Sequence, residues 1–263
     1  MKKYIYIFSI ILGVLVLYFA SLYFLQDKLL FKPDNNYISP KKANLDNVSE
    51  NMITMSDGTK VMVWAKDGDK KLPAILFFHG NRGQIAEFAP QIISFNKEGY
   101  GTFLAEYRGY GNSEGKINQD KMFSDGAEIY DWIKTKGYSK VVIIGYSFGC
   151  AASLGLSNKR DVDGIVLIAP FASLSRLVAE KYPFSNLILK DDYPSETFIK
   201  KLEKPILIIH SHADKLIPVH HAKILYKNRS NYTSLHLLDK EDHRGTFWAK
   251  ETSILISNWL KHL

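Results

Sequence analysis

The stretch "VVIIGYSFGCAASLGL", residues 141–156, places a serine between two glycines at the end of an apolar run. The β-branched residues before Gly145 are typical of a buried strand, and the small residues after Gly149 favour a closely packed helix. Gly145, Ser147 and Gly149 fit G-x-S-x-G, the strand–turn–helix pattern that presents a nucleophilic serine. Side chains at the two glycine positions would clash with the adjoining strand and helix. An ordinary turn needs one glycine at most, so the pattern predicts a nucleophile at Ser147.

A serine hydroxyl becomes a good nucleophile only when a base accepts its proton, and a carboxylate usually orients that base. Asp214 follows the apolar run "PILIIH", and His243 follows "TSLHLLD". Alone, Asp214 also fits a loop residue or a helix cap, and His243 fits a surface histidine. The chain order Ser147, Asp214, His243, with each residue just beyond its own expected strand, predicts a catalytic triad.

The developing oxyanion needs backbone donors in addition to the triad. One is expected from the N–H of Phe148, the residue after the nucleophile. The other is expected from the loop "FFHGNRGQ", where two glycines allow close backbone approach. Asn81 is the first choice for this second donor and Arg82 the next, although the loop also fits an ordinary glycine turn.

Strands and helices alternate from residue 50 onward. Asp57-Gly58 separates two strand-like runs and predicts a hairpin. Further strands are expected at 73–79, 100–107, 141–145, 164–169, 205–210 and 233–239, with helices at 84–98, 120–136 (Asp120 as N-cap), 219–228 and 246–262. Repeated β-α units predict an α/β fold, a mostly parallel sheet with helices on both faces and a site at the carboxyl ends of the strands.

The N-terminal residues 4–25 contain no charged side chain. As a helix they would be about 33 Å long, enough for a hydrocarbon core of about 30 Å. A cleaved signal peptide is the alternative, but no A-x-A-like site follows, because Tyr18 and Leu22 flank Ala20. Residues 1–25 are therefore expected to be a retained single-pass anchor, and 26–47 a linker. Lys2 and Lys3 favour a cytoplasmic N-terminus and an extracytoplasmic catalytic domain over residues 48–263.

Composition narrows the possible partners and cofactors. The formal charge is +7: residues 1–33 hold four lysines and one aspartate (+3), and the remainder holds 30 basic and 26 acidic residues (+4). Because the excess is scattered along the chain, it indicates a solvated surface and no nucleic-acid partner. The single cysteine, Cys150, excludes an internal disulfide framework and is expected to be a small buried residue.

The ordered motifs "HGN", "YRGYGNSEG", "GYSFG", "HADKLIP" and "DH" resemble those of α/β-hydrolases of the serine hydrolase type, over residues 50–263. The chain is most similar to membrane-anchored, small-lid members described as peptidase-like or as α/β-hydrolase-domain proteins. This resemblance implies eight strands with an antiparallel second strand, a triad of Ser147, Asp214 and His243, and no cofactor. Two departures are Glu106, where many relatives have aspartate, and Cys150, where many have a second glycine.

The expected function is a serine hydrolase that cleaves carboxyl esters or thioesters through an acyl-enzyme on Ser147. A small acyl substrate is expected, without metal or cofactor. Two alternatives stay open: an aminopeptidase-like amide hydrolase, and a non-catalytic α/β-hydrolase-fold binding protein. An intact triad argues against the second, and Ser147 excludes an elbow that uses a carboxylate nucleophile.

Two segments carry weaker hypotheses. The histidine-rich "HSHADKLIPVHH" (210–221) could bind metal, but Asp214 has the better-motivated role in a triad. Residues 170–204 stand where a short lid would insert, which predicts an open site. Phe171, Tyr182, Phe184 and Tyr193 are candidates for an acyl pocket, with core and lid packing as the alternative.

Overall fold

A single eight-stranded sheet forms the centre of the computed structural model, which describes residues 2–182 and 184–263. Its spatial order is β10-β9-β8-β7-β4-β6-β3-β2. The strands are β2 (Ser49–Thr54), β3 (Lys60–Lys66), β4 (Ala74–Phe78), β6 (Gly101–Ala105), β7 (Val141–Tyr146), β8 (Gly164–Ile168), β9 (Ile206–Ser211) and β10 (Thr233–Leu238). Strand β3 runs antiparallel to both its neighbours, and all other neighbouring pairs are parallel. The prediction of a mostly parallel sheet with an antiparallel second strand is confirmed.

Helices cover both faces of the sheet. Side chains alternate along β4, so Leu76 and Phe78 join one hydrophobic cluster while Ile75 and Phe77 join the other. The first cluster packs under α3 (Gln119–Thr135), α4 (Phe148–Ser157), α6 (Ser195–Ile199) and α7 (His220–Asn228). The second packs under α2 (Ile85–Ser94), η1 (Phe95–Glu98), α8 (His243–Trp248) and α9 (Lys250–Leu260). Burial on both faces explains why β4, β7, β8 and β9 read as continuous apolar runs.

Two helix boundaries differ from the sequence expectation. Helix α3 is capped by the side chain of Asn118, which accepts the N–H of Lys121, and the predicted cap Asp120 lies within the helix. Both residues are good N-caps, so composition alone did not distinguish them. The expected final helix over 246–262 is two helices, because Ala249 between them has extended backbone. The first begins at His243.

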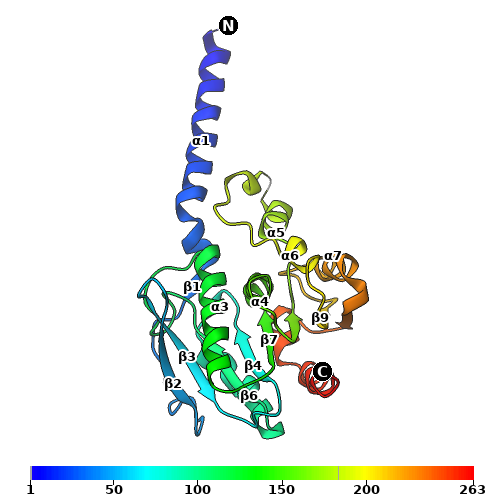
Figure 1. The fold of residues 1–263 in the computed structure, drawn as a ribbon. Helices are drawn as coiled ribbons and strands as arrows, with labels where there is room; N and C mark the ends of the chain where they lie inside the picture. The colour runs from blue at the N-terminus through cyan, green and yellow to red at the C-terminus, as the bar shows by residue number, and fades with distance from the viewer. Residues whose placement is uncertain (1, 183) are drawn as a thin grey trace.

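Helix α1 (Lys2–Leu30) projects from the rest of the molecule (Figure 1). It is long and apolar enough to cross a membrane, with a mean hydropathy of 2.5 over its best window, and none of that window is buried. The helix continues to Leu30, beyond the expected span of 4–25. The two-residue strand β1 (Lys32–Pro33) then pairs with β5 (Arg82–Gly83), so the chain that leaves α1 is fixed to the loop after β4.

The segment between β8 and β9 holds α5 (Leu174–Lys181), η2 (Ser185–Ile188) and α6. In Figure 1 this lid lies at the end of the molecule from which α1 projects. The two are joined at Gln26, which is the buried residue of α1: its amide donates to the carbonyl of Ile188 at 3.2 Å and accepts the N–H of Lys190 at 2.9 Å.

Candidate active site

Ser147 occupies a strained turn between β7 and α4. Its φ of 54° and ψ of −115° are rare for a residue with a side chain. A Cβ at Gly149 would lie 2.1 Å from the carbonyl oxygen of Phe78, and one at Gly145 would lie 2.4 Å from Ser153 Oγ. The glycines therefore let strand and helix approach closely enough to hold Ser147 in this conformation.

The structure brings the three predicted triad side chains together. His243 Nε2 lies 2.9 Å from Ser147 Oγ, and His243 Nδ1 lies 2.7 Å from Asp214 Oδ2. The three residues follow β7, β9 and β10 at the carboxyl edge of the sheet, where parallel α/β sheets form their sites. Tyr146 steadies the histidine backbone, because its hydroxyl donates to the carbonyl of His243 at 3.2 Å.

Asp214 is held as an anion. Its Oδ1 accepts the backbone N–H groups of Leu216 and Ile217, each at 2.9 Å. Burial by itself raises the pKa of Asp214, but hydrogen bonds from His210 and His243 outweigh it and keep that pKa well below its usual range. With Asp214 ionised, the Nδ1–H of His243 donates to it, and the lone pair on Nε2 faces the serine.

His210 contributes to this site, which the sequence did not indicate. Its buried Nε2–H donates to the carbonyl of Ile217 at 2.9 Å and lies 3.4 Å from Asp214 Oδ2. The Oδ2 of Asp214 therefore lies near a ring nitrogen of both His210 and His243. Only its place at the end of an expected strand, two residues before His212, was visible in the sequence.

Of the two residues expected to supply oxyanion donors, Phe148 directly follows Ser147 and Asn81 lines the same cleft. Among the described residues, no acceptor is bonded to the backbone N–H of Phe148 or of Asn81. Gly80 approaches Ser147 closely, since a Cβ there would lie 3.6 Å from Ser147 Cβ. The carbonyl of Asn81 accepts the N–H of Lys32 at 3.0 Å and the hydroxyl of Tyr110 at 2.8 Å. This loop is therefore held from both sides.

Glu106, the departure noted in the sequence, supports the same loop. Its Oε1 lies 2.7 Å from Nε2 of the buried His79, and its Oε2 accepts the N–H of Ile85 at 3.0 Å. The hydroxyl of Tyr107 donates to the carbonyl of His79 at 2.7 Å. The carboxylate thus links the end of β4 to the start of α2.

A cleft of about 670 Å³ opens over Ser147. Three cations line it, namely Arg82, Lys215 and Arg244, together with the carboxylates of Glu87 and Asp242. Arg244 lies 3.6 Å from Glu87, and Asp242 accepts the N–H of Gly245 as the cap of α8. Arg82 and Lys215 pair with no carboxylate among the described residues, so the cleft carries a net positive charge.

The four aromatic candidates for an acyl pocket divide into two pairs. Phe171 and Tyr193 are buried against the ring of Phe148, with centroids 5.8 and 4.6 Å away. Tyr182 and Phe184 are exposed on the lid and do not line the cleft. Phe171 and Tyr193 therefore belong to the core that packs around Phe148, which agrees with the alternative of core packing.

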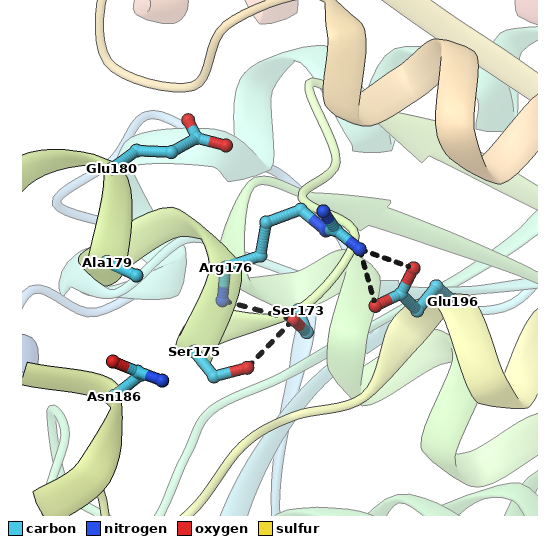
Figure 2. A pocket seen from close by; sticks show the side chains of 7 residues that line it. All are labelled: Ser173, Ser175, Arg176, Ala179, Glu180, Asn186 and Glu196. Carbon is cyan, nitrogen blue, oxygen red and sulfur yellow. Dashed lines mark hydrogen bonds and ion pairs between the residues drawn. The ribbon is translucent and has the colours of Figure 1, made fainter. Parts of the chain in front are cut away.

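A separate hollow of about 460 Å³ lies within the lid, and Figure 2 shows the side chains that line it. Arg176 lies 3.3 Å from Glu196, and the hydroxyl of Ser173 accepts the N–H of Arg176. The hollow shares no lining residue with the cleft over Ser147. Of its charged groups, Arg176 and Glu196 pair with each other, and Glu180 lies 2.8 Å from His220 outside the hollow.

The histidine-rich segment is not arranged as a good metal site. Glu180, His220 and His221 bring three possible ligand atoms within 4.8 Å of one another. However, His221 Nδ1 accepts the N–H of Ala172 at 3.2 Å, so the neutral ring carries its proton on Nε2. A ligand nitrogen needs a free lone pair, whereas this N–H lies 3.4 Å from Glu180. His210 uses its Nε2–H in the triad region, and His212 is exposed.

Comparison with known proteins agrees with this architecture. Residues 69–190 match the family described as serine aminopeptidase, S33. The uncharacterized protein YfhR of Escherichia coli K12 is 26% identical over 229 residues, which is 82% of this chain and 80% of YfhR. Lysophosphatidylserine lipase ABHD12 of Danio rerio is 27% identical over 250 residues, which is 84% of this chain and 65% of that protein.

Solved structures show the same fold. The esterase Pf2001 of Pyrococcus furiosus superimposes with a TM-score of 0.72 at 22% identity, covering 89% of this chain and 97% of the esterase. A hydrolase of Thermoplasma acidophilum, described as predicted and CIB-like, superimposes with a TM-score of 0.64 at 21% identity. The match covers 82% of this chain and 99% of that hydrolase. The chain belongs to the α/β-hydrolase superfamily. The solved structures share its fold, and the family matched over residues 69–190 is one of hydrolases.

Proposed function

We propose that the protein is a serine hydrolase that cleaves carboxyl esters or thioesters through an acyl-enzyme on Ser147. The observation that carries this proposal is the continuous relay from Ser147 Oγ through His243 to Asp214, at 2.9 and 2.7 Å. These distances suit direct proton transfer from the serine to the imidazole.

In the proposed mechanism, His243 Nε2 accepts the hydroxyl proton as Ser147 Oγ bonds to the substrate carbonyl carbon. The N–H groups of Phe148 and Asn81 stabilise the oxyanion, and the dipole of α4 adds to this because the anion lies at its N-terminus. His243 then gives its proton to the leaving group, and the acyl-enzyme forms. A water molecule then gives a proton to His243 and bonds to the acyl carbon. The bond from that carbon to Ser147 Oγ breaks, and His243 returns the proton to Ser147 as the acid product leaves. Only the neutral imidazole of His243 can serve as the base.

The charge of the cleft favours the ester and thioester proposal over an aminopeptidase. An aminopeptidase must bind the ammonium group of its substrate close to the nucleophile. Here the cleft has two cations without a carboxylate partner, Arg82 and Lys215, while Glu87 and Asp242 are already engaged. A neutral or anionic acyl substrate therefore fits better.

Helix α1 is proposed to anchor the protein in a membrane. The apolar residues 4–25 are exposed or half-buried throughout, so the helix has no protein core to pack into. Lys2 and Lys3 favour a cytoplasmic N-terminus, with the hydrolase on the other side.

Fluorophosphonate labelling tests the catalytic proposal, because the reagent reacts with activated serines. Intact-mass spectrometry and peptide mapping should find one adduct, on Ser147. The adduct should be absent from Ser147→Ala and from His243→Ala. An adduct elsewhere, or hydrolysis that survives Ser147→Ala, would falsify the mechanism.

A further inference from the structure

Three large hydrophobic side chains are exposed together at the tip of the lid. Tyr182, Phe184 and Leu187 have 56%, 67% and 76% of their surface accessible to solvent, and are called the lid-tip surface below. Other exposed hydrophobic side chains outside α1, such as Met52, Tyr232 and Ile254, come from separate elements. Scattered exposed side chains are ordinary, whereas a cluster indicates a binding surface.

The lid-tip surface is fixed at one level of helix α1. The amide of Gln26 bonds to the backbone of Ile188 and Lys190, on either side of Leu189. Lys190 Nζ also lies 3.0 Å from Asp27 Oδ2 and 5.3 Å above the ring of Tyr23. Because these contacts surround the end of η2, Leu187 lies close to residues 23–27 of the helix.

That level is where the apolar part of α1 ends. Leu25 is the last residue of the uncharged stretch, and Gln26, Asp27 and Lys28 follow it. In a membrane-spanning helix such a change marks the boundary between hydrocarbon and headgroups, where tyrosine and lysine are enriched. Lys28 and Lys190 are exposed at this level of the helix, where a positive charge complements anionic headgroups.

The cleft opens on the same side of the molecule. The chain after α1 pairs with the loop that contains Asn81, at the carboxyl edge of the sheet. At the base of the lid, Lys181 Nζ donates to the carbonyl of Leu216 at 2.7 Å, and Leu216 is a half-exposed lining residue of the cleft. The lid therefore contacts the mouth of the cleft at Leu216.

We propose that the lid-tip surface inserts into the headgroup region of the membrane that α1 crosses, so that the cleft takes acyl esters carried by the bilayer. The proposal rests on the membrane attachment and esterase activity given above. Amphipathic surfaces of this kind bind membranes through buried apolar area together with cationic attraction. The acyl substrate then reaches Ser147 from the lipid side, past Leu216.

Depth-dependent quenching in liposomes tests the position of the lid tip. An environment-sensitive fluorophore is attached to Leu187→Cys in the full-length protein, reconstituted in phosphatidylcholine and phosphatidylglycerol. The native Cys150 is fully buried and its pKa is raised by burial, so it should label poorly, which unsubstituted protein checks. Val16→Cys, in the middle of α1, reports attachment, and Tyr232→Cys is the exposed control.

The fluorophore at Leu187→Cys should be quenched by nitroxide lipids labelled near the headgroup. The fluorophore at Val16→Cys should be quenched by nitroxide lipids labelled at the end of the acyl chain. The fluorophore at Tyr232→Cys should be quenched by neither kind of lipid. Quenching at Val16→Cys without quenching at Leu187→Cys overturns the lid proposal and leaves the attachment standing. Absence of quenching at both positions overturns both. A blue shift at Leu187→Cys that grows with protein concentration in detergent means a second copy of the chain, and also overturns the proposal.

A paired activity measurement tests the role of the surface. The double variant Phe184→Ser, Leu187→Ser should lose at least tenfold in hydrolysis of a long-chain acyl ester embedded in liposomes, because two apolar side chains no longer enter the membrane. Hydrolysis of a short, water-soluble ester should stay within twofold. Equal loss on both substrates indicates a structural role and overturns the proposal. If neither ester is cleaved by unsubstituted protein, but the quenching pattern holds, the esterase function fails while the membrane contact stands.

Discussion

Phe31 packs edge-on against Phe148, with ring centroids 5.2 Å apart and planes at 90°. Phe31 directly follows helix α1, and Phe148 directly follows Ser147. The side chain of Asn81 also donates to the carbonyl of Leu30. The end of the helix therefore touches both residues proposed as oxyanion donors.

This contact predicts that Phe31 positions the oxyanion donors. Phe31→Ala should lower kcat by about tenfold or more with little change in KM, because small displacements of groups that act in the transition state are costly. Phe31→Leu should restore most of the activity by refilling the space. Rates are measured per active site, titrated with a fluorophosphonate. If Phe31→Ala lowers thermal stability but leaves kcat per site within twofold, the ring has only a structural role.

Removal of the nucleophile is the most direct prediction. Ser147→Ala should lower kcat by roughly 10⁴–10⁶, because binding and the oxyanion donors alone retain little catalysis. The measurement is a panel of acyl esters, acyl thioesters and aminoacyl amides with both proteins. Esters and thioesters should be cleaved faster than aminoacyl amides. Preference for the amides would instead favour the aminopeptidase alternative.

The sequence predicted the fold well because its signals are local. The apolar runs of β4, β7, β8 and β9 are continuous since both faces of each strand are covered, and glycines mark the elbow. Ser147, Asp214 and His243 could be singled out because parallel strands end at one edge of the sheet, so position relative to each strand suffices. Their roles remain a proposal.

Contacts between distant parts of the chain could not be predicted. Phe31 meets Phe148 across 117 residues of sequence, and no residue pattern near position 31 signals it. Residues 26–47 were expected to be a linker because they follow the predicted anchor, yet Gln26 bonds to the lid and Lys32 to the Asn81 loop. The division into residues 1–25, 26–47 and 48–263 stays a prediction, and these contacts are a physical reason to test it.

Helix α1 is predicted to retain the protein in membranes. Full-length protein should stay in the pellet after an alkaline carbonate wash, since about 30 Å of apolar helix is buried in lipid. The double variant Val14→Asp, Val16→Lys should be released, because a charge at the centre of a span costs about 2.5–3.5 kcal/mol. Tyr232→Lys, on the surface of the hydrolase, is the matched control and should stay in the pellet. Release of unsubstituted full-length protein would show that α1 is no anchor.

Stability should fall as the pH drops from 7 to 5, and His221 should contribute to this. Burial lowers the pKa of His221 to about 4, because its effect is larger than the rise caused by the nearby Glu180. In the unfolded chain a histidine has a pKa near 6.5. Between these values the unfolded state binds a proton that the folded state does not, so stability is full above about pH 7 and is lost on acidification. Between pH 7 and pH 5, His221 is expected to lower the free energy of unfolding by about 1–3 kcal/mol.

Thermal unfolding in detergent at pH 7.5 and pH 5 measures this effect. His221→Asn keeps an acceptor near Nδ1 for the N–H of Ala172 but does not titrate. It should therefore show a smaller drop in Tm between the two pH values than the unsubstituted protein. An equal drop in both proteins would assign the acid sensitivity to other groups.

Asp214 and Asp242 are two carboxylates near His243: Asp214 bonds to its ring, and Asp242 precedes it in the chain. Asp214→Asn should preserve the fold and lower kcat by about 10⁴, because the amide cannot hold the imidazole in the required tautomer or stabilise the imidazolium. Asp242 caps α8 through the N–H of Gly245, and asparagine caps helices as well as aspartate does. Asp242→Asn should therefore keep kcat within a few fold and thermal stability nearly unchanged. Steady-state kinetics and thermal unfolding of both variants decide the assignment. Wild-type kcat in Asp214→Asn, together with a large loss in Asp242→Asn, would move the acidic member of the triad to Asp242.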